Sequence, residues 1–126
     1  MAQKILIVED NSDVSRLLAF CLNDAGYETS RAGNLAQGIG KALAEHPDLI
    51  ITDLCLPDMT AVDATVILKQ DPATSGIPIV VLTAMTVGEW KTKALKAGVA
   101  KYLIKPISRT ELTEAIRTLA KGGLAR

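Results

Sequence analysis

The sequence is poor in the residues that mark disulfide-stabilised and zinc-stabilised proteins. Its 126 residues include two cysteines and one histidine. Cys21 and Cys55 lack Cys-x-x-Cys spacing, and His46 adds too few ligands for a tetrahedral zinc set. A chain of this length with 48% hydrophobic residues can bury enough surface for one core without a disulfide. We therefore expect a single domain over residues 1–126.

Net charge and long apolar runs are also absent. The 14 basic and 14 acidic side chains cancel, whereas nucleic-acid and anionic-membrane surfaces need clustered positive charge. The sequence has no run of about 18 apolar residues, and Met1 to Lys4 lead into a strand pattern rather than into the apolar segment of a signal peptide. We expect a cytoplasmic protein without membrane insertion or direct nucleic-acid binding, whose partners are proteins or small molecules.

The pattern that is present centres on residues 48–53. Residues 49–51 form an unbroken apolar run, which is typical of a parallel strand covered by helices on both faces. Asp53 follows this run directly. Open α/β sheets place their chemistry in the crevice at the carboxyl ends of their strands, so the carboxylate of Asp53 is expected in that crevice.

The same succession of a short apolar strand and a helix-like segment occurs five times. The strands are expected at residues 4–8, 27–32, 48–53, 79–82 and 100–104. The helices are expected to start after Asp10, at Asn34, at Ala61, after Thr86 and after Ser108, and to end near Ala25, His46, Gln70, Gly98 and Gly122. Regular βα alternation implies right-handed crossovers, and therefore an α/β fold with a doubly wound five-stranded parallel sheet and five helices.

Local patterns specify how these helices begin and which sides they bury. Capping boxes are matched by Asn34 with Gln37, Thr86 with Glu89, and Ser108 with Glu111. Helical spacing places Cys21 in the apolar stripe of the first helix, with Val14, Leu17, Leu18, Leu22 and Ala25, as a buried small hydrophobe. The residues available for the buried side of the third helix are Val62, Val66, Ile67 and Leu68.

Polar side chains follow four of the expected strands, at one edge of the sheet. Glu9 and Asp10 follow the first strand, Asp53 the third, Thr83 the fourth and Lys105 the fifth. Each taken alone has an ordinary structural explanation, but three crowded acids repel one another unless a cation joins them. An all-oxygen cluster beside a lysine favours Mg²⁺ and phosphate chemistry. Asp53 can then act as a nucleophile, with Lys105 and Thr83 holding the phosphoryl group.

These residues fall in motifs that resemble the receiver domain of two-component response regulators, in the stand-alone form of the chemotaxis and cell-cycle regulators. The motifs are Val8-Glu9-Asp10-Asn11, Asp53 with Pro57, Thr83-Ala84, and Tyr102-Leu103-Ile104-Lys105-Pro106. Each motif alone has low specificity, but four of them at the ends of the correct strands are specific. The resemblance implies the flavodoxin-like strand order 2-1-3-4-5.

The resemblance also implies a signalling function for the sheet edge. Asp53 would accept a phosphoryl group from a phosphohistidine on a histidine kinase or histidine phosphotransfer protein. Asp10, Asp53 and the backbone carbonyl of Cys55 would bind Mg²⁺ directly, and Glu9 would act through bound water. Such a protein is not a conventional enzyme, although it catalyses its own phosphorylation and its own slow dephosphorylation.

A conformational switch is implied as well. Thr83 would be the switch hydroxyl and Lys105 the phosphate partner, while Tyr102 would turn inward as Thr83 moves toward the phosphoryl group. The Lys105-Pro106 bond would be cis. The output would be a change of protein partner on the surface of the fourth helix, fifth strand and fifth helix, with no effector domain after Arg126.

Some residues depart from the family pattern. Thr60-Ala61 replaces the usual small acidic or polar residue and glycine, and alanine adopts a left-handed turn less freely than glycine. The segment 99–101 lacks the paired aspartates with which many DNA-binding relatives dimerise. Cys55 and Met85, two positions after the phosphoacceptor and the switch threonine, orient water poorly and indicate slow hydrolysis. Trp90 is either a core anchor or a partner contact.

Three other classes of protein fit the sequence less well. An aspartate-nucleophile phosphatase needs a second aspartate two residues after the first, where this chain has Cys55. A flavodoxin-like electron carrier would have its flavin phosphate repelled by Glu9 and Asp10. A pseudo-receiver, which binds partners without phosphorylation, has usually lost part of the acidic and lysine set that this chain retains.

Overall fold

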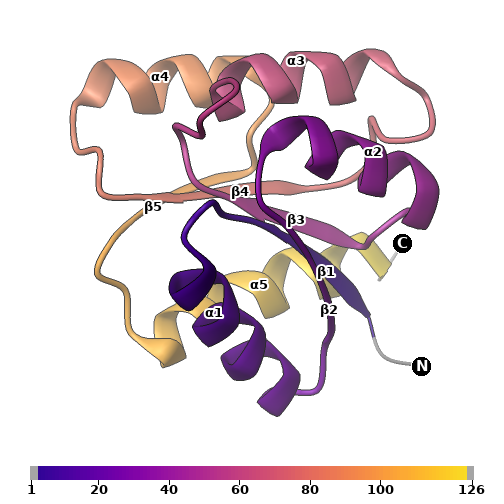
Figure 1. Cartoon of the computed structure of the whole chain (residues 1–126), viewed down its shortest axis with the longest axis vertical. Coiled ribbons are helices and arrows are strands. Elements are labelled where there is room, and N and C mark those ends of the chain that lie inside the picture. Colours follow the sequence, from indigo (N-terminus) through magenta and orange to yellow (C-terminus); the bar gives the residue numbers. More distant parts are fainter. Residues whose placement is uncertain (1–2, 125–126) are drawn as a thin grey trace.

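The computed structural model describes residues 3–124 and shows one sheet between two layers of helices (Figure 1). The elements are β1 (Lys4–Val8), α1 (Ser12–Asp24), β2 (Glu28–Ala32), α2 (Leu35–Glu45), β3 (Leu49–Thr52), α3 (Ala61–Gln70), β4 (Ile79–Thr83), α4 (Gly88–Ala97), β5 (Lys101–Ile104) and α5 (Arg109–Leu124). The strands pair in parallel in the order β2-β1-β3-β4-β5. Helices α1 and α5 cover one face, and α2, α3 and α4 cover the other. The predicted fold and strand order are confirmed.

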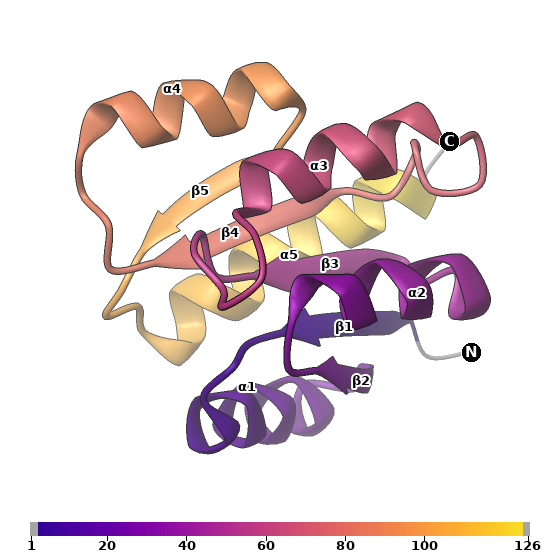
Figure 2. The same ribbon diagram turned by 45° about the horizontal axis from the view of Figure 1, so that its top comes forward.

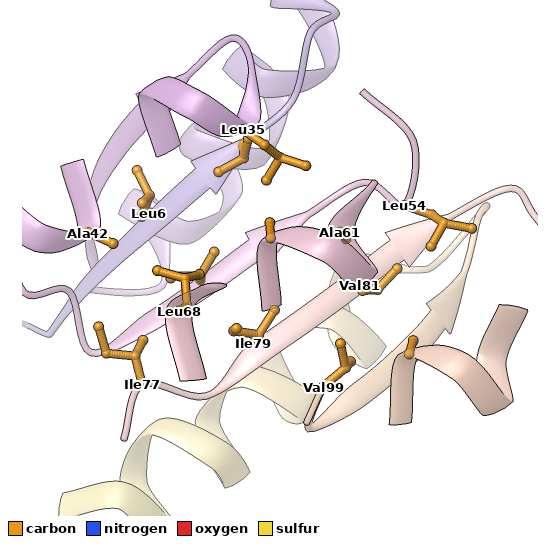
Figure 3. Packing of buried hydrophobic residues seen from close by; sticks show 14 of the residues in the cluster. Leu6, Leu35, Ala42, Leu54, Ala61, Leu68, Ile77, Ile79, Val81 and Val99 are labelled. Atoms are coloured by element: carbon orange, nitrogen blue, oxygen red, sulfur yellow. The ribbon is translucent and has the colours of Figure 1, made fainter. Parts of the chain in front are cut away.

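Unbroken apolar runs in the strands supply both faces of the core. Ile5 and Ile7 of β1 pack toward α1 and α5, whereas Leu6 and Val8, which alternate with them, pack toward α2 and α3. Figure 3 shows part of the core on the side of Leu6 and Val8, where side chains of the sheet meet those of α2 and α3. The double coverage explains why these strands lack polar alternation.

The helix starts agree with two of the three predicted caps. The Asn34 side chain accepts from the Gln37 amide, although the Gln37 side chain accepts from Gly33 rather than Asn34. At α5, Ser108 and Glu111 bond reciprocally as predicted. The cap at Thr86 is wrong. Helix α4 begins one residue later than that pattern requires, and its N-cap residue, Val87, makes no side-chain bond.

The predicted helix ends are correct except at the last helix. Gly26 follows α1 and Gly98 follows α4, both with positive φ, as a glycine stop requires. Residue 46 ends α2, also with positive φ. The stop at Gly122 is wrong, because α5 continues through Leu124. None of the helices in the described chain has the length and apolar character that a membrane span requires.

Two predictions of buried helix faces need correction. Helix α3 buries a stripe of small residues and one leucine, namely Ala61, Ala64, Thr65 and Leu68, and this stripe brings the helix close to the sheet. Val66 and Ile67 lie off this stripe and are exposed. On α1 the buried residues are Ser15, Ala19 and Leu22. Leu17 is therefore exposed rather than buried, and Cys21 is half-buried.

Two glycines of α2 provide a test of the packing between α2 and the sheet. A Cβ at Gly38 would lie 2.8 Å from the Cγ2 methyl of the buried Val8, whereas a Cβ at Gly40 meets nothing within 4 Å. Overpacking costs about 1–3 kcal/mol, and alanine gains about 1 kcal/mol over glycine in a helix. Urea unfolding should show Gly38→Ala destabilised by about 1 kcal/mol and Gly40→Ala stabilised by up to about 1 kcal/mol. Effects of the same sign would contradict this packing.

Candidate phosphoacceptor site

The parallel sheet brings the predicted polar residues to one edge. All strand arrows point toward this edge, and the loops that follow β1, β3, β4 and β5 meet there (Figure 2). Val8 is in register with Thr52, so Glu9 and Asp53 leave neighbouring strands side by side. The amide of Lys105 donates to the carbonyl of Thr83 at 2.8 Å, which joins the β4 and β5 ends.

Lys105 lies between two of the acids. Its Nζ is 3.2 Å from Oε1 of Glu9 and 3.2 Å from Oδ2 of Asp53. Burial alone would lower the pKa of Lys105, but the hydrogen bond and negative charge of Asp53, together with Glu9, outweigh burial and raise it. The ammonium therefore stays charged and partly neutralises the acids.

The two paired acids differ in how open they are. The Glu9 side chain is only 5% exposed, and its second oxygen accepts from the Asn11 amide at 3.1 Å. The Asp53 side chain is 20% exposed, and its Oδ1 accepts from the Leu54 amide at 2.6 Å. Asp53 thus combines a fixed orientation with access from solvent, whereas Glu9 is enclosed and supports Lys105.

The predicted Mg²⁺ ligands are only partly gathered. Within residues 3–124, no group of three or more His, Cys, Asp or Glu side chains is arranged to hold a metal ion. The predicted ligand from Cys55 is its backbone carbonyl, not its exposed thiol. Two of the predicted carboxylates, Glu9 and Asp53, are held together by the Lys105 ammonium that lies between them. The exposed Asp10 carboxylate has no partner among the described residues. The donor chemistry of these hard oxygens nevertheless fits Mg²⁺.

The predicted switch residues meet at Met85. The buried Thr83 hydroxyl oxygen accepts from the Met85 amide at 3.2 Å, and the Tyr102 hydroxyl donates to the Met85 carbonyl at 2.9 Å. Burial, with smaller electrostatic contributions from Cys55 and Asp53, raises the pKa of Tyr102, so its phenol remains a hydrogen-bond donor. The Tyr102 side chain is already buried, before any phosphoryl group is bound. The Lys105-Pro106 bond is cis, as expected.

The loop between β3 and α3 tolerates Thr60-Ala61 without a glycine. Thr60 has extended backbone and caps α3, accepting from the Asp63 amide at 3.2 Å. Ala61 starts the helix, and its amide donates to the Leu54 carbonyl at 2.7 Å. Neither residue is among the described positions with positive φ, so this loop does not require a glycine there.

Sequence reasoning missed two features of the structure. Asp58, in the loop after β3, accepts from the amides of Leu35 and Ala36 at the start of α2. Leu17 and Phe20 of α1 are each 64% exposed. Local sequence carries no signal for these two hydrogen bonds, because the residues that they join are more than 20 positions apart in the chain. The helical spacing of Leu17 indicated burial instead.

The fold and this edge define a class of protein. The family model for the response regulator receiver domain matches residues 5–117, and the chain belongs to that family. It is 38% identical over 122 residues to the transcriptional regulatory protein CusR of Escherichia coli K12, covering 97% of this chain and 53% of that protein. The chain thus spans about half the length of the curated relatives it matches.

Solved structures give the same result. A CheY-like receiver domain protein from Methanospirillum hungatei superposes with a TM-score of 0.93 at 25% identity, covering 99% of this chain and 98% of that one. The receiver domain of the sensor histidine kinase PA1611 from Pseudomonas aeruginosa superposes with a TM-score of 0.88 at 28% identity, covering 96% and 99%. That structure has a magnesium ion coordinated in its active-site cleft.

Proposed function

We propose that this receiver domain is a phosphoacceptor of a two-component system or phosphorelay, and that Asp53 takes the phosphoryl group from a phosphohistidine donor. The observation that supports this most is the position of Lys105, whose Nζ lies 3.2 Å from the partly exposed Asp53 carboxylate. A carboxylate that is open to solvent and held beside a charged ammonium can attack phosphorus while the developing charge is neutralised.

The transfer moves one phosphoryl group. A bond forms between an Asp53 carboxylate oxygen and phosphorus, and the bond between phosphorus and the donor imidazole nitrogen breaks. Lys105 neutralises a phosphoryl oxygen as a point charge, and the Thr83 hydroxyl donates to another. Asp10, Asp53 and the Cys55 carbonyl would hold Mg²⁺, and Glu9 would act through water; the ion, when bound, supplies positive charge for the phosphoryl oxygens.

Phosphorylation by a small donor tests this function. Incubation with acetyl phosphate and Mg²⁺ should add one phosphoryl group to the wild-type chain, as measured by intact-protein mass spectrometry. Asp53→Asn should remain unmodified, because an amide oxygen does not form the acyl phosphate. Asp63→Asn, which changes an exposed aspartate of α3, is the control and should be modified like the wild type. Undiminished label on Asp53→Asn would defeat the assignment.

The output of the switch is proposed to be a change of partner on the surface formed by α4, β5 and α5. Because Tyr102 already donates to the Met85 carbonyl, phosphorylation would stabilise this inward ring rather than create it. If Thr83 moved toward the phosphoryl group, it would pull on Met85 as well, because the Met85 amide donates to the Thr83 hydroxyl oxygen. Trp90 of α4 is half-buried, and Lys93 lies over its ring at 5.0 Å.

The lifetime of the phosphorylated state is predicted to be long. Cys55 is exposed and Met85 half-buried, and neither side chain is a strong hydrogen-bonding partner for an attacking water. Replacing them by Cys55→Asn with Met85→Glu should speed hydrolysis by about tenfold, equivalent to about 1.4 kcal/mol in the barrier. The decay of the phosphorylated mass over time measures this rate. Equal rates, or wild-type loss within seconds, would mean that these side chains do not set the lifetime.

The phosphohistidine donor is proposed to dock on α1. This helix begins directly after Asp10 and Asn11, beside the site, and exposes Leu17 and Phe20. Two large apolar side chains on the solvent side of one helix suit a partner with an apolar helix face of its own. The position of α1 would bring such a donor close to Asp53.

A further inference from the structure

Asp58 joins the loop after β3 to the start of α2. Its Oδ1 accepts from the Leu35 amide at 3.0 Å, and its Oδ2 accepts from the Ala36 amide at 2.8 Å. Leu35 and Ala36 are the first two residues of α2. One exposed carboxylate thus uses both oxygens on a helix that lies more than 20 residues away in the sequence.

This contact completes the cap of α2. The first four amides of a helix have no partner within the helix. The Gln37 amide donates to the Asn34 side chain at 2.8 Å, and the Gly38 amide donates to the Asn34 carbonyl at 3.0 Å. The remaining two amides donate to Asp58. A negative carboxylate there also favours the positive end of the helix dipole, and the two backbone bonds lower the pKa of Asp58.

The same contact anchors the loop between β3 and α3, which contains Cys55. Within this loop the Ala61 amide donates to the Leu54 carbonyl at 2.7 Å, and the Leu56 amide donates to the Met59 carbonyl at 3.1 Å. These bonds hold the loop to itself, whereas Asp58 attaches it to a second element. Cys55 lies inside the loop, directly after Leu54. Its carbonyl direction therefore depends on how the loop is anchored.

We propose that Asp58 is a positioning residue for the site: by binding the α2 amides, it holds the loop so that the Cys55 carbonyl and the Asp53 carboxylate face one Mg²⁺ ion. This inference rests on the proposed function, because it assigns Asp58 a role in binding the ion of that site. Asp58 acts through the loop and touches neither phosphate nor metal.

Mg²⁺ affinity of the full chain, measured by calorimetry without a phosphodonor, tests the proposal. Asp58→Ala should weaken Mg²⁺ binding by about tenfold, the lower end of the loss when a supporting partner of a metal ligand is removed. Asp58→Asn keeps one acceptor oxygen and should lose less. Asp63→Ala is the matched control, because it removes the same charge from the adjacent helix, where the carboxylate has no partner among the described residues.

Two further measurements separate positioning from stability. Amide hydrogen exchange at Leu35 and Ala36 should accelerate in Asp58→Ala and stay unchanged in Asp63→Ala, while thermal unfolding verifies that both variants are folded. Equal Mg²⁺ affinities of the two variants, or unchanged exchange in Asp58→Ala, would overturn the role of Asp58. A wild type that binds no Mg²⁺ but still phosphorylates Asp53 would overturn it as well, and a wild type that never phosphorylates Asp53 would instead reject the proposed function.

Discussion

Lys105→Met is expected to slow the phosphorylation of Asp53 by acetyl phosphate by about 10- to 100-fold, because a hydrogen bond to a charged group contributes about 1.5–3 kcal/mol. Lys105 is the cation placed 3.2 Å from both Glu9 and Asp53. Methionine keeps the length of the side chain but removes its charge. The rate follows from intact mass measured over time at saturating Mg²⁺.

The same substitution should change Mg²⁺ binding in the opposite direction. Without the ammonium, Glu9 and Asp53 repel each other more strongly, so a divalent cation should bind more tightly. Lys101→Met is the control, since Lys101 is a half-buried lysine at the start of β5, the strand whose other end leads to Lys105 and the site. Lys105→Met with a wild-type phosphorylation rate, or with weakened Mg²⁺ binding, would contradict the role assigned to Lys105.

The second large effect concerns the protein donor. Leu17→Ala combined with Phe20→Ala should reduce phosphotransfer from a phosphorylated histidine kinase or phosphotransfer protein by about 30-fold or more, since central apolar anchors contribute about 2 kcal/mol or more to an interface. Both residues are 64% exposed, so truncation of their side chains creates no large cavity in the core. Transfer is measured as loss of label from the donor.

Acetyl phosphate separates docking from chemistry in this variant. The small donor needs no helix surface, so its reaction with the double variant should match that of the wild type. Val66→Ala combined with Ile67→Ala removes an exposed apolar pair from α3, on the other face of the sheet, and should transfer normally from the protein donor. If both donors slowed equally in the α1 variant, or the α3 variant slowed as much, α1 would not be the docking helix.

Residue patterns predicted the sheet because burial on both faces leaves a signal in every residue of a strand. The runs in β1, β3 and β4 have no polar alternation, and the residues after them therefore meet at one edge. That geometry alone brought Glu9, Asp53, Thr83 and Lys105 together. Lys105 pairs with two of the three acids, whereas the divalent cation that the charge argument called for stays a prediction.

Helix faces and long-range contacts carried a weaker signal. Val66 and Ile67 are apolar like Leu68, yet only Leu68 lies on the small-residue stripe that contacts the sheet. The patterns at Thr86 and Ser108 are alike in type, but a helix that starts one residue later makes no use of Thr86. The bond from Asp58 to α2 depends on tertiary folding, which a local motif does not encode.

Chemical trapping of the acyl phosphate tests the central claim most directly. Borohydride reduces an aspartyl phosphate to homoserine, which peptide mass spectrometry locates in the sequence. After treatment with acetyl phosphate and Mg²⁺, homoserine is expected at position 53 and at no other aspartate. Homoserine at Asp10, or stable label with no homoserine at all, would contradict the account that Asp53 is the phosphoacceptor.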